Sequence, residues 1–207
     1  MRSILYKEFM VERTMILIYA AAVVLFSLRV VPIFFPLALS VCLAAFFMFT
    51  SMVHEDMNNT HVLINSLPVD RKTVVTAKYV FYLAVGVGFI ALDILLEAAA
   101  GARLPDIARQ SGLALLGFAW FVSVFFPVYI WHGSRFVQIA VVTLFVMGAM
   151  AIPIVHHLRE KTGLWGIPDA VASLPDAPLY GLAAAATGLV LIASWFLSVR
   201  LYERKQF

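Results

Sequence analysis

The chain has little charge and almost no cysteine. Only 13% of its 207 residues are Asp, Glu, Lys or Arg, whereas 63% are hydrophobic. Charged residues make up about a quarter of an average soluble domain, so this chain has too few to cover a water-soluble core. The single cysteine, Cys42, excludes a disulfide within the chain and any cluster of cysteine metal ligands. The composition therefore predicts an integral membrane protein.

Motifs of the common enzyme classes are also missing. The sequence contains neither a GxxxxGK[ST] phosphate loop nor a GxSxG nucleophile turn, and His54-Glu55 lacks the second histidine of an HExxH zinc site. The basic residues are dispersed and form no aromatic-interleaved patch, so nucleic-acid binding is not indicated. The sequence therefore predicts no catalytic, cofactor-binding or metal-ligating residue, and it favours a membrane protein that is not an enzyme.

Six apolar segments are long enough, or nearly so, to cross about 30 Å of hydrocarbon as helices. Helices and closed barrels are the structures that satisfy their backbone groups in lipid, and these runs are too continuously apolar for barrel strands. The expected spans lie at about residues 14–31, 35–53, 78–100, 112–131, 136–155 and 179–201. The predicted fold is one all-α transmembrane domain over residues 1–207.

The residues before the first span mix apolar and charged side chains. They are Ile4, Leu5, Lys7, Glu8, Phe9, Met10, Glu12 and Arg13. This pattern fits a short amphipathic helix on the membrane surface, and it fits equally the cytoplasmic start of the first span.

The 15 basic residues are distributed unevenly between the two sides of a six-span protein. The side with both termini receives ten: Arg2, Lys7, Arg13, Arg71, Lys72, Lys78, Arg135, Arg200, Arg204 and Lys205. The other side receives five: Arg29, Arg103, Arg109, Arg159 and Lys161. Because cytoplasmic loops carry an excess of Lys and Arg, this asymmetry predicts that both termini and residues 55–78 are cytoplasmic.

Residues 55–78 form the longest hydrophilic interruption in the chain. They contain an apolar turn with Leu63 and Leu67, a helix stop at Pro68, and Asp70 in position to cap a new helix. An apolar turn with a charged rim favours a docking element, although an ordinary loop on the lipid surface is the alternative.

Asp93 and Glu97 lie one helical turn apart within the third apolar segment. A charge near the bilayer centre costs about 2.5–3.5 kcal/mol on insertion scales, so these carboxylates require polar surroundings. Arg29 is expected at a comparable depth, and one hypothesis is a charge cluster of Arg29, Asp93 and Glu97 that lines a cavity. The alternative places the two carboxylates at the outer interface without a role in transport.

Small residues recur at a spacing that is typical of close helix packing. The pairs are Ala84/Gly88, Gly181/Ala185 and Ala184/Gly188. Such contacts can lie within the subunit or between subunits, and packing within the subunit is the default for Ala-rich membrane helices.

Four stretches together resemble the small six-span permeases of the ABC-2 type exporter family, including permeases of the phenol-soluble modulin exporter group. They are LYKEF at residues 5–9, ED..N....INSLPVDRKTVVTAKY at 55–79, FPVYIWHGSRF at 126–136 and S.RLYERKQF at 198–207. The resemblance implies an exporter permease in the bacterial cytoplasmic membrane. It also implies a dimer with an identical or related permease, and two copies of a separate ATPase that bind ATP and magnesium.

The resemblance also implies which residues contact the ATPase. The segment after the second span would contain a coupling helix, and the link at His132 to Arg135 would form a second contact. The implied coupling residues are Glu55, Asp56, Asn59, Leu63, Leu67, Pro68, Arg71, Lys72, His132, Gly133 and Arg135. Two alternatives remain open: an ion-coupled secondary transporter that uses Asp93 and Glu97, and a membrane scaffold or sensor without transport activity.

Overall fold

The structure, a computed structural model, describes residues 2–27, 36–58, 70–101, 104–141, 143 and 176–204. Its long helices are α1 (Arg2–Ser27), α2 (Pro36–Met57), α4 (Arg71–Ala99), α5 (Leu104–His132) and α8 (Asp176–Arg204). A further helical segment covers residues 134–141. The described ranges contain no β-strand, so the all-α prediction is confirmed for this part of the chain.

Within the described residues, four helical stretches are long and apolar enough to cross a membrane. They are Ile4–Ser27, Arg71–Ala99, Gln110–His132 and Tyr180–Arg204. Helix α2, in the predicted second span, packs against α1, α4 and α5 within the same bundle. The predicted fifth span, 136–155, is described as helix at residues 136–141 and 143, and its remainder lies outside the described residues.

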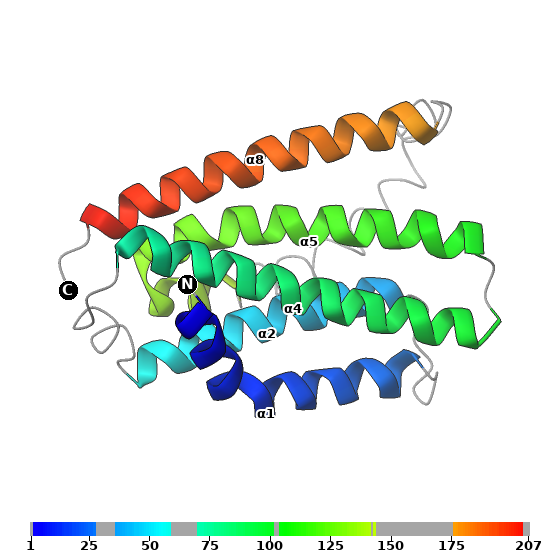
Figure 1. Ribbon diagram of the computed structural model, residues 1–207, viewed down its shortest axis with the longest axis horizontal. Helices are drawn as coiled ribbons and strands as arrows, with labels where there is room; N and C mark the ends of the chain where they lie inside the picture. Colours follow the sequence, from blue (N-terminus) through cyan, green and yellow to red (C-terminus); the bar gives the residue numbers. More distant parts are fainter. Residues whose placement is uncertain are drawn as a thin grey trace.

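Helix α4 is the centre of the bundle. It packs against α1, α2, α5 and α8, and α5 also packs extensively against α8. Figure 1 shows the N-terminal turns of α1, the C-terminal ends of α2 and α8, and the start of α4 at the same end of the bundle. Both ends of the described chain therefore lie at this end of the bundle.

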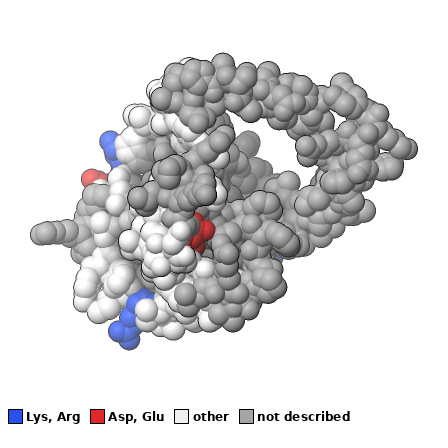
Figure 2. Space-filling model, turned by 90° about the vertical axis from the view of Figure 1, so that its right-hand side faces the viewer, with Lys and Arg blue, Asp and Glu red and all other residues white. Residues whose placement is uncertain are grey.

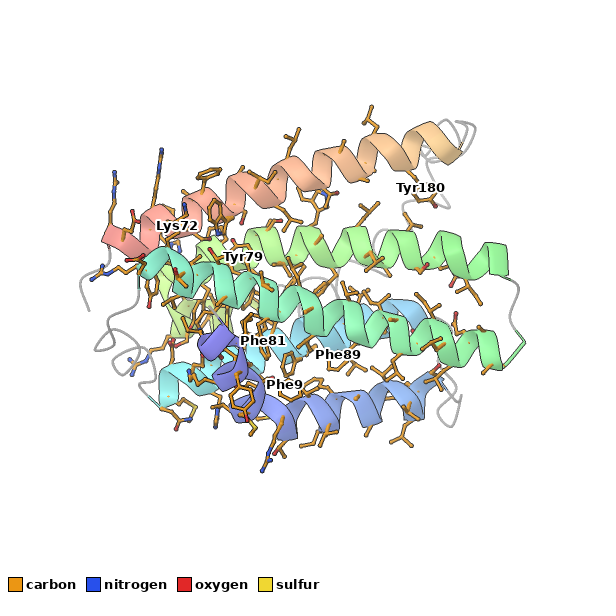
Figure 3. The ribbon with its side chains drawn as sticks, in the orientation of Figure 1. Phe9, Lys72, Tyr79, Phe81, Phe89 and Tyr180 are labelled. Carbon is orange, nitrogen blue, oxygen red and sulfur yellow. The ribbon has the colours of Figure 1, made fainter. Side chains whose placement is uncertain are left out.

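Aromatic residues of α4 fill two sides of that helix. On one side, the ring centroids of Phe81 and Phe89 lie 6.4 and 5.8 Å from the centroid of Phe47 in α2. On another side, the ring of Tyr79 stacks on Phe126 of α5 at 4.1 Å. Figure 3 shows Tyr79 toward α5 and α8, and Phe81 and Phe89 toward α1 and α2. Helix α4 therefore joins the two halves of the bundle.

The helices extend beyond the predicted spans. Helix α1 runs without a break from Arg2 to Ser27, so the amphipathic N-terminal residues are continuous with the spanning helix, and Figure 1 shows these turns angled to the rest of α1. Helix α2 continues to Met57 and α4 begins at Arg71, so residues 55–57 and 71–78 of the predicted loop are helical. Charged side chains in these turns have partners on neighbouring helices, which allows the helices to continue.

Among the described residues, the small-residue pairs do not pack within the subunit, which was the default expectation. A Cβ atom added at Gly88, Gly181 or Gly188 would meet no atom within 4 Å, and Ala84 and the two paired alanines of α8 are exposed. Spacing alone did not reveal which face of each helix is turned toward the bundle.

Candidate functional site

Charged side chains gather at one end of the bundle. We call this the charged end, and it comprises the first turns of α1 and α4 and the last turns of α2, α5 and α8. The basic residues with described side chains in this half are Lys7, Arg13, Arg71, Lys72, Lys78, Arg135, Arg200 and Arg204, whereas the side chains of Arg29, Arg103, Arg109, Arg159 and Lys161 lie outside the described residues. Figure 2 faces the opposite end, where the described part of the surface is largely uncharged apart from an acidic patch near the middle and charged groups at the margin.

A buried ion cluster joins α1, α2 and α4 at the charged end. The Lys78 ammonium forms an ion pair with Glu55, and its Nζ atom lies 3.9 Å from Oε1 of Glu8. Glu8 is 1% exposed and Glu55 is 8% exposed. Lys7 provides a second cation, 3.4 Å from the same Glu8 oxygen. Because charges are costly to bury unless they are paired, these contacts hold the three helix ends together.

The first turns of α1 have their charges inside and their apolar residues outside. Glu8 and Glu12 are both 1% exposed, whereas Tyr6, Phe9 and Val11 are more than half exposed. This orientation suits a helix whose outer face meets lipid. Glu12 lies near the hydroxyl group of Ser51 in α2, and neither of its carboxylate oxygens makes a hydrogen bond of standard geometry among the described residues. The sequence did not predict these buried acids, because the same spacing also fits a surface helix.

Asp56 in the last turn of α2 contacts α5. The hydroxyl group of Tyr129 lies 2.6 Å from Asp56 Oδ1 and 3.1 Å from the carbonyl oxygen of Met52. A hydroxyl group carries a single proton, and the shorter, charge-assisted contact to Asp56 is the stronger one. Glu55 and Asp56, both implied as ATPase contacts, thus interact with residues of this chain.

Two cations at the start of α4 contact the end of α8. The Arg71 guanidinium donates hydrogen bonds to the carbonyl oxygens of Glu203, at 2.9 Å, and Tyr202, at 3.4 Å. A cation at this position satisfies terminal carbonyl groups and the negative end of the helix dipole. The Lys72 ammonium lies 5.2 Å from the centroid of the Trp195 ring, within the range of a cation–π contact. Figure 3 shows Lys72 on the side of α4 that faces α8.

The link after α5 turns at Gly133. This residue has a φ of +80°, which favours glycine, and its amide donates a hydrogen bond of 2.9 Å to the carbonyl oxygen of Tyr129. The ring of His132 stacks on Phe136 with centroids 4.3 Å apart, and His132 and Arg135 are exposed. The link therefore presents an aromatic and basic surface at the charged end.

A protein-family model described as "ABC-2 family transporter protein" matches residues 3–203 of the chain. The chain belongs to this family. The match covers nearly the whole sequence and confirms the predicted resemblance to ABC-2 permeases. Searches of curated proteins and of solved structures gave no significant match. Family membership and the apolar helices identify a multi-pass membrane protein that is a transport component, and they indicate a permease of an ABC transporter.

Some of the predicted residues of this ABC-2 chain lie outside the described residues. They are Arg29, Asn59, Leu63, Leu67 and Pro68. Their predicted roles stay predictions.

Asp93 of the ABC-2 chain lies inside the bundle, near the end opposite the charged end. It is 1% exposed and lies near the hydroxyl groups of Ser27 in α1 and Ser40 in α2, and its Oδ2 atom has no hydrogen-bond partner among the described residues. Glu97, one turn further along, is half-buried. The described part of the chain contains no group of three or more His, Cys, Asp or Glu residues that could bind a metal ion.

Proposed function

We propose that this chain is the permease subunit of an ATP-driven exporter in the bacterial cytoplasmic membrane. It crosses the membrane six times with both termini in the cytoplasm, and it forms the translocation pathway as a dimer with an identical or related permease. Two copies of a separate ATPase bind ATP and magnesium and supply the energy. The chain itself catalyses no reaction.

The observation that carries this proposal is the match to the ABC-2 family over residues 3–203, together with the position of the segment between α2 and α4. Both ends of this segment, residues 58–70, lie at the charged end of the bundle. A segment between two long helices that pack against each other can convert contact with a partner into rigid-body motion of those helices. We therefore place the ATPase contact on residues 59–69, with Leu63 and Leu67 as its apolar part, and a second contact on the link at His132 to Arg135.

The orientation is supported by the distribution of positive charge. The sequence assigns ten of the 15 basic residues to the side with both termini, and eight of these ten have described side chains, which lie at the charged end with residues 58 and 70. The positive-inside rule places such an end in the cytoplasm, where the ATPase is located. In an ATP-driven exporter the ATPase binds on the cytoplasmic side, so the basic end is the side on which the ATPase contact is expected.

An ion-coupled carrier is the second candidate, and the buried Asp93 favours it. A membrane-embedded carboxylate near Ser27 and Ser40 could bind and release a proton or another cation. In that case transport in proteoliposomes would require an ion gradient and would not require an ATPase. If the chain is an ion-coupled carrier, the Asp93→Asn substitution would abolish transport. If the chain is an ATP-driven exporter, the Asp93→Asn variant would still transport in an ATP-dependent manner.

Co-purification with the candidate ATPase tests the proposal. We expect the wild-type chain to retain the ATPase and a Leu63→Asp/Leu67→Asp variant to lose it, because the new charges would disrupt the apolar contact. Arg200→Asp is the matched control, since it places an acidic residue on the exposed end of α8 outside the segment. Equal binding by both variants would contradict the assignment of residues 59–69 and would favour a carrier or a scaffold.

A further inference from the structure

The described residues on either side of the 58–70 segment bind to this chain's own helices. Glu55 pairs with Lys78, Asp56 accepts a hydrogen bond from Tyr129, and Arg71 donates to carbonyl groups of α8. We propose that these three residues couple the C-terminal end of α2 and the N-terminal end of α4 to α1, α5 and α8 during transport, and that they are not ATPase contacts. This inference rests on the proposed function.

The α2 side of the segment is linked to two other helices. Glu55 binds Lys78, and Lys78 in turn lies 3.9 Å from Glu8, so a movement of the α2 end changes the position of the first turns of α1. The adjacent residue, Asp56, binds Tyr129 of α5 at 2.6 Å. Two neighbouring carboxylates therefore connect one helix end to both sides of the bundle.

The α4 side of the segment is linked to α8. Arg71, the first residue of α4, binds the last carbonyl groups of α8, and Trp195 of α8 donates a hydrogen bond of 3.0 Å to Thr76. One turn further along, the Tyr79 hydroxyl lies 2.7 Å from Ser194 and 2.8 Å from Ser198. The start of α4 and the end of α8 are therefore expected to move as one unit.

Burial argues against a direct role of Glu55 in docking. Its side chain is 9% exposed and that of Lys78 is 14% exposed. If Glu55 turned outward to meet a partner, the Lys78 ammonium would lose its nearest counter-ion inside the bundle, which is an unfavourable change. Transmission requires no such loss, because the pair can move as a unit with the ends of α2 and α4.

A charge exchange separates positioning from docking. The variants are Glu55→Lys, Lys78→Glu and the double exchange, each assayed for ATPase co-purification and for ATP hydrolysis relative to the ATPase alone. We expect both single variants to bind the ATPase. The change in hydrolysis rate that they cause, relative to the ATPase alone, should be less than a fifth of the change caused by the wild-type chain, because coupling between two sites is typically worth 5- to 150-fold. The double exchange restores an ion pair between α2 and α4, and we expect it to recover most of the wild-type effect.

Tyr129→Phe provides a milder test at a second link. It removes the hydrogen bond from α5 to Asp56 without introducing a charge, so the chain is expected to fold and to bind the ATPase while its effect on hydrolysis falls. Tyr6→Phe is the matched control, because it removes the same hydroxyl group from a side chain of α1 that is 64% exposed.

Weaker ATPase binding in the Glu55 and Tyr129 variants, with unchanged hydrolysis in the complexes that still form, would overturn the inference and would place these residues in the docking surface. Failure of the double exchange to recover, together with the same effect for Tyr129→Phe as for Tyr6→Phe, would also overturn it. A wild-type chain that binds no ATPase would instead overturn the proposed function, and this inference with it.

Discussion

The ring of Phe118 in α5 lies directly over Gly86 in α4. A Cβ atom at Gly86 would fall 2.1 Å from Cε1 and 2.3 Å from Cζ of that ring, far inside van der Waals contact. Phe118 is 1% exposed, so its ring has little room to move away. Glycine at this position allows α4 and α5 to approach closely.

A Gly86→Ala variant is therefore expected to be less stable than the wild type. Overpacking of a filled core costs about 1–3 kcal/mol, and thermal unfolding of the purified chain in detergent measures the loss. Gly88→Ala is the matched control, because both variants gain the same helix propensity and a Cβ at Gly88 meets no atom within 4 Å. Equal stabilities of Gly86→Ala and Gly88→Ala would contradict the close approach of α4 and α5. A second substitution, Phe118→Leu, should restore part of the stability that Gly86→Ala loses.

The hydroxyl network around Tyr79 joins three helices. Tyr79 of α4 contacts Ser194 and Ser198 of α8, and Ser194 donates a hydrogen bond to the carbonyl oxygen of Ser123 in α5. We expect Tyr79→Phe to lower the free energy of unfolding by about 0.5–2 kcal/mol, as for other interhelical hydrogen bonds in membranes. Ser198→Ala should cost less, because Tyr79 keeps its contact with Ser194. A larger loss in Ser198→Ala than in Tyr79→Phe would contradict this network.

Glu8 and Glu12 lie on the same face of α1 but differ in their partners. Glu8 lies near Lys78 and Lys7, so Glu8→Gln is expected to destabilise the chain by about 1–3 kcal/mol. Neither oxygen of Glu12 makes a hydrogen bond of standard geometry in the described structure, so a neutral Gln of similar shape is expected to leave stability unchanged or to raise it. Thermal unfolding of the two variants compares them directly. A larger loss for Glu12→Gln than for Glu8→Gln would show that Glu12 has a stabilising partner.

Asp93 is expected to stabilise the contact of α1, α2 and α4. Replacement by Ala leaves the hydroxyl groups of Ser27 and Ser40 without their neighbouring carboxylate, and we expect a loss of about 1–3 kcal/mol. Asp93→Asn keeps an acceptor and should cost less.

The predicted pairing with Arg29 requires a double-mutant cycle of Arg29→Gln and Asp93→Asn. Residues in direct contact give a coupling energy of about 0.5–3 kcal/mol, whereas additive effects would contradict the cluster. Thermal unfolding of the two single variants and the double variant provides the measurement.

The helical membrane fold could be predicted from the sequence, because a helix that crosses the bilayer needs an apolar run as long as the hydrocarbon core is thick. The sequence predicted the helix ends less well. Glu8, Glu12 and Lys78 were placed in the membrane-surface region, since a charged residue normally ends an apolar span. In the structure these charges face neighbouring helices, and the helices continue past them.

The ATPase-coupling residues were chosen for their charge and position, and charge alone does not indicate which partner a side chain meets. Glu55, Asp56 and Arg71 are polar and lie beside an interruption in the apolar pattern, as docking residues would. Their actual contacts are with Lys78, Tyr129 and the end of α8, which are between 23 and 132 residues away in the sequence. Such long-range pairs are set by the packing of the bundle, and local sequence patterns do not encode them.

Site-specific cross-linking tests the central claim most directly. In a Cys42→Ser background the chain has no other cysteine, so a single cysteine can be placed at will. With a short cysteine-to-lysine reagent, Leu63→Cys and Leu67→Cys are expected to cross-link to the ATPase, whereas Asp56→Cys, which faces Tyr129, is not. Cross-linking from position 56 but not from 63 or 67 would contradict the account, as would its absence at all three positions.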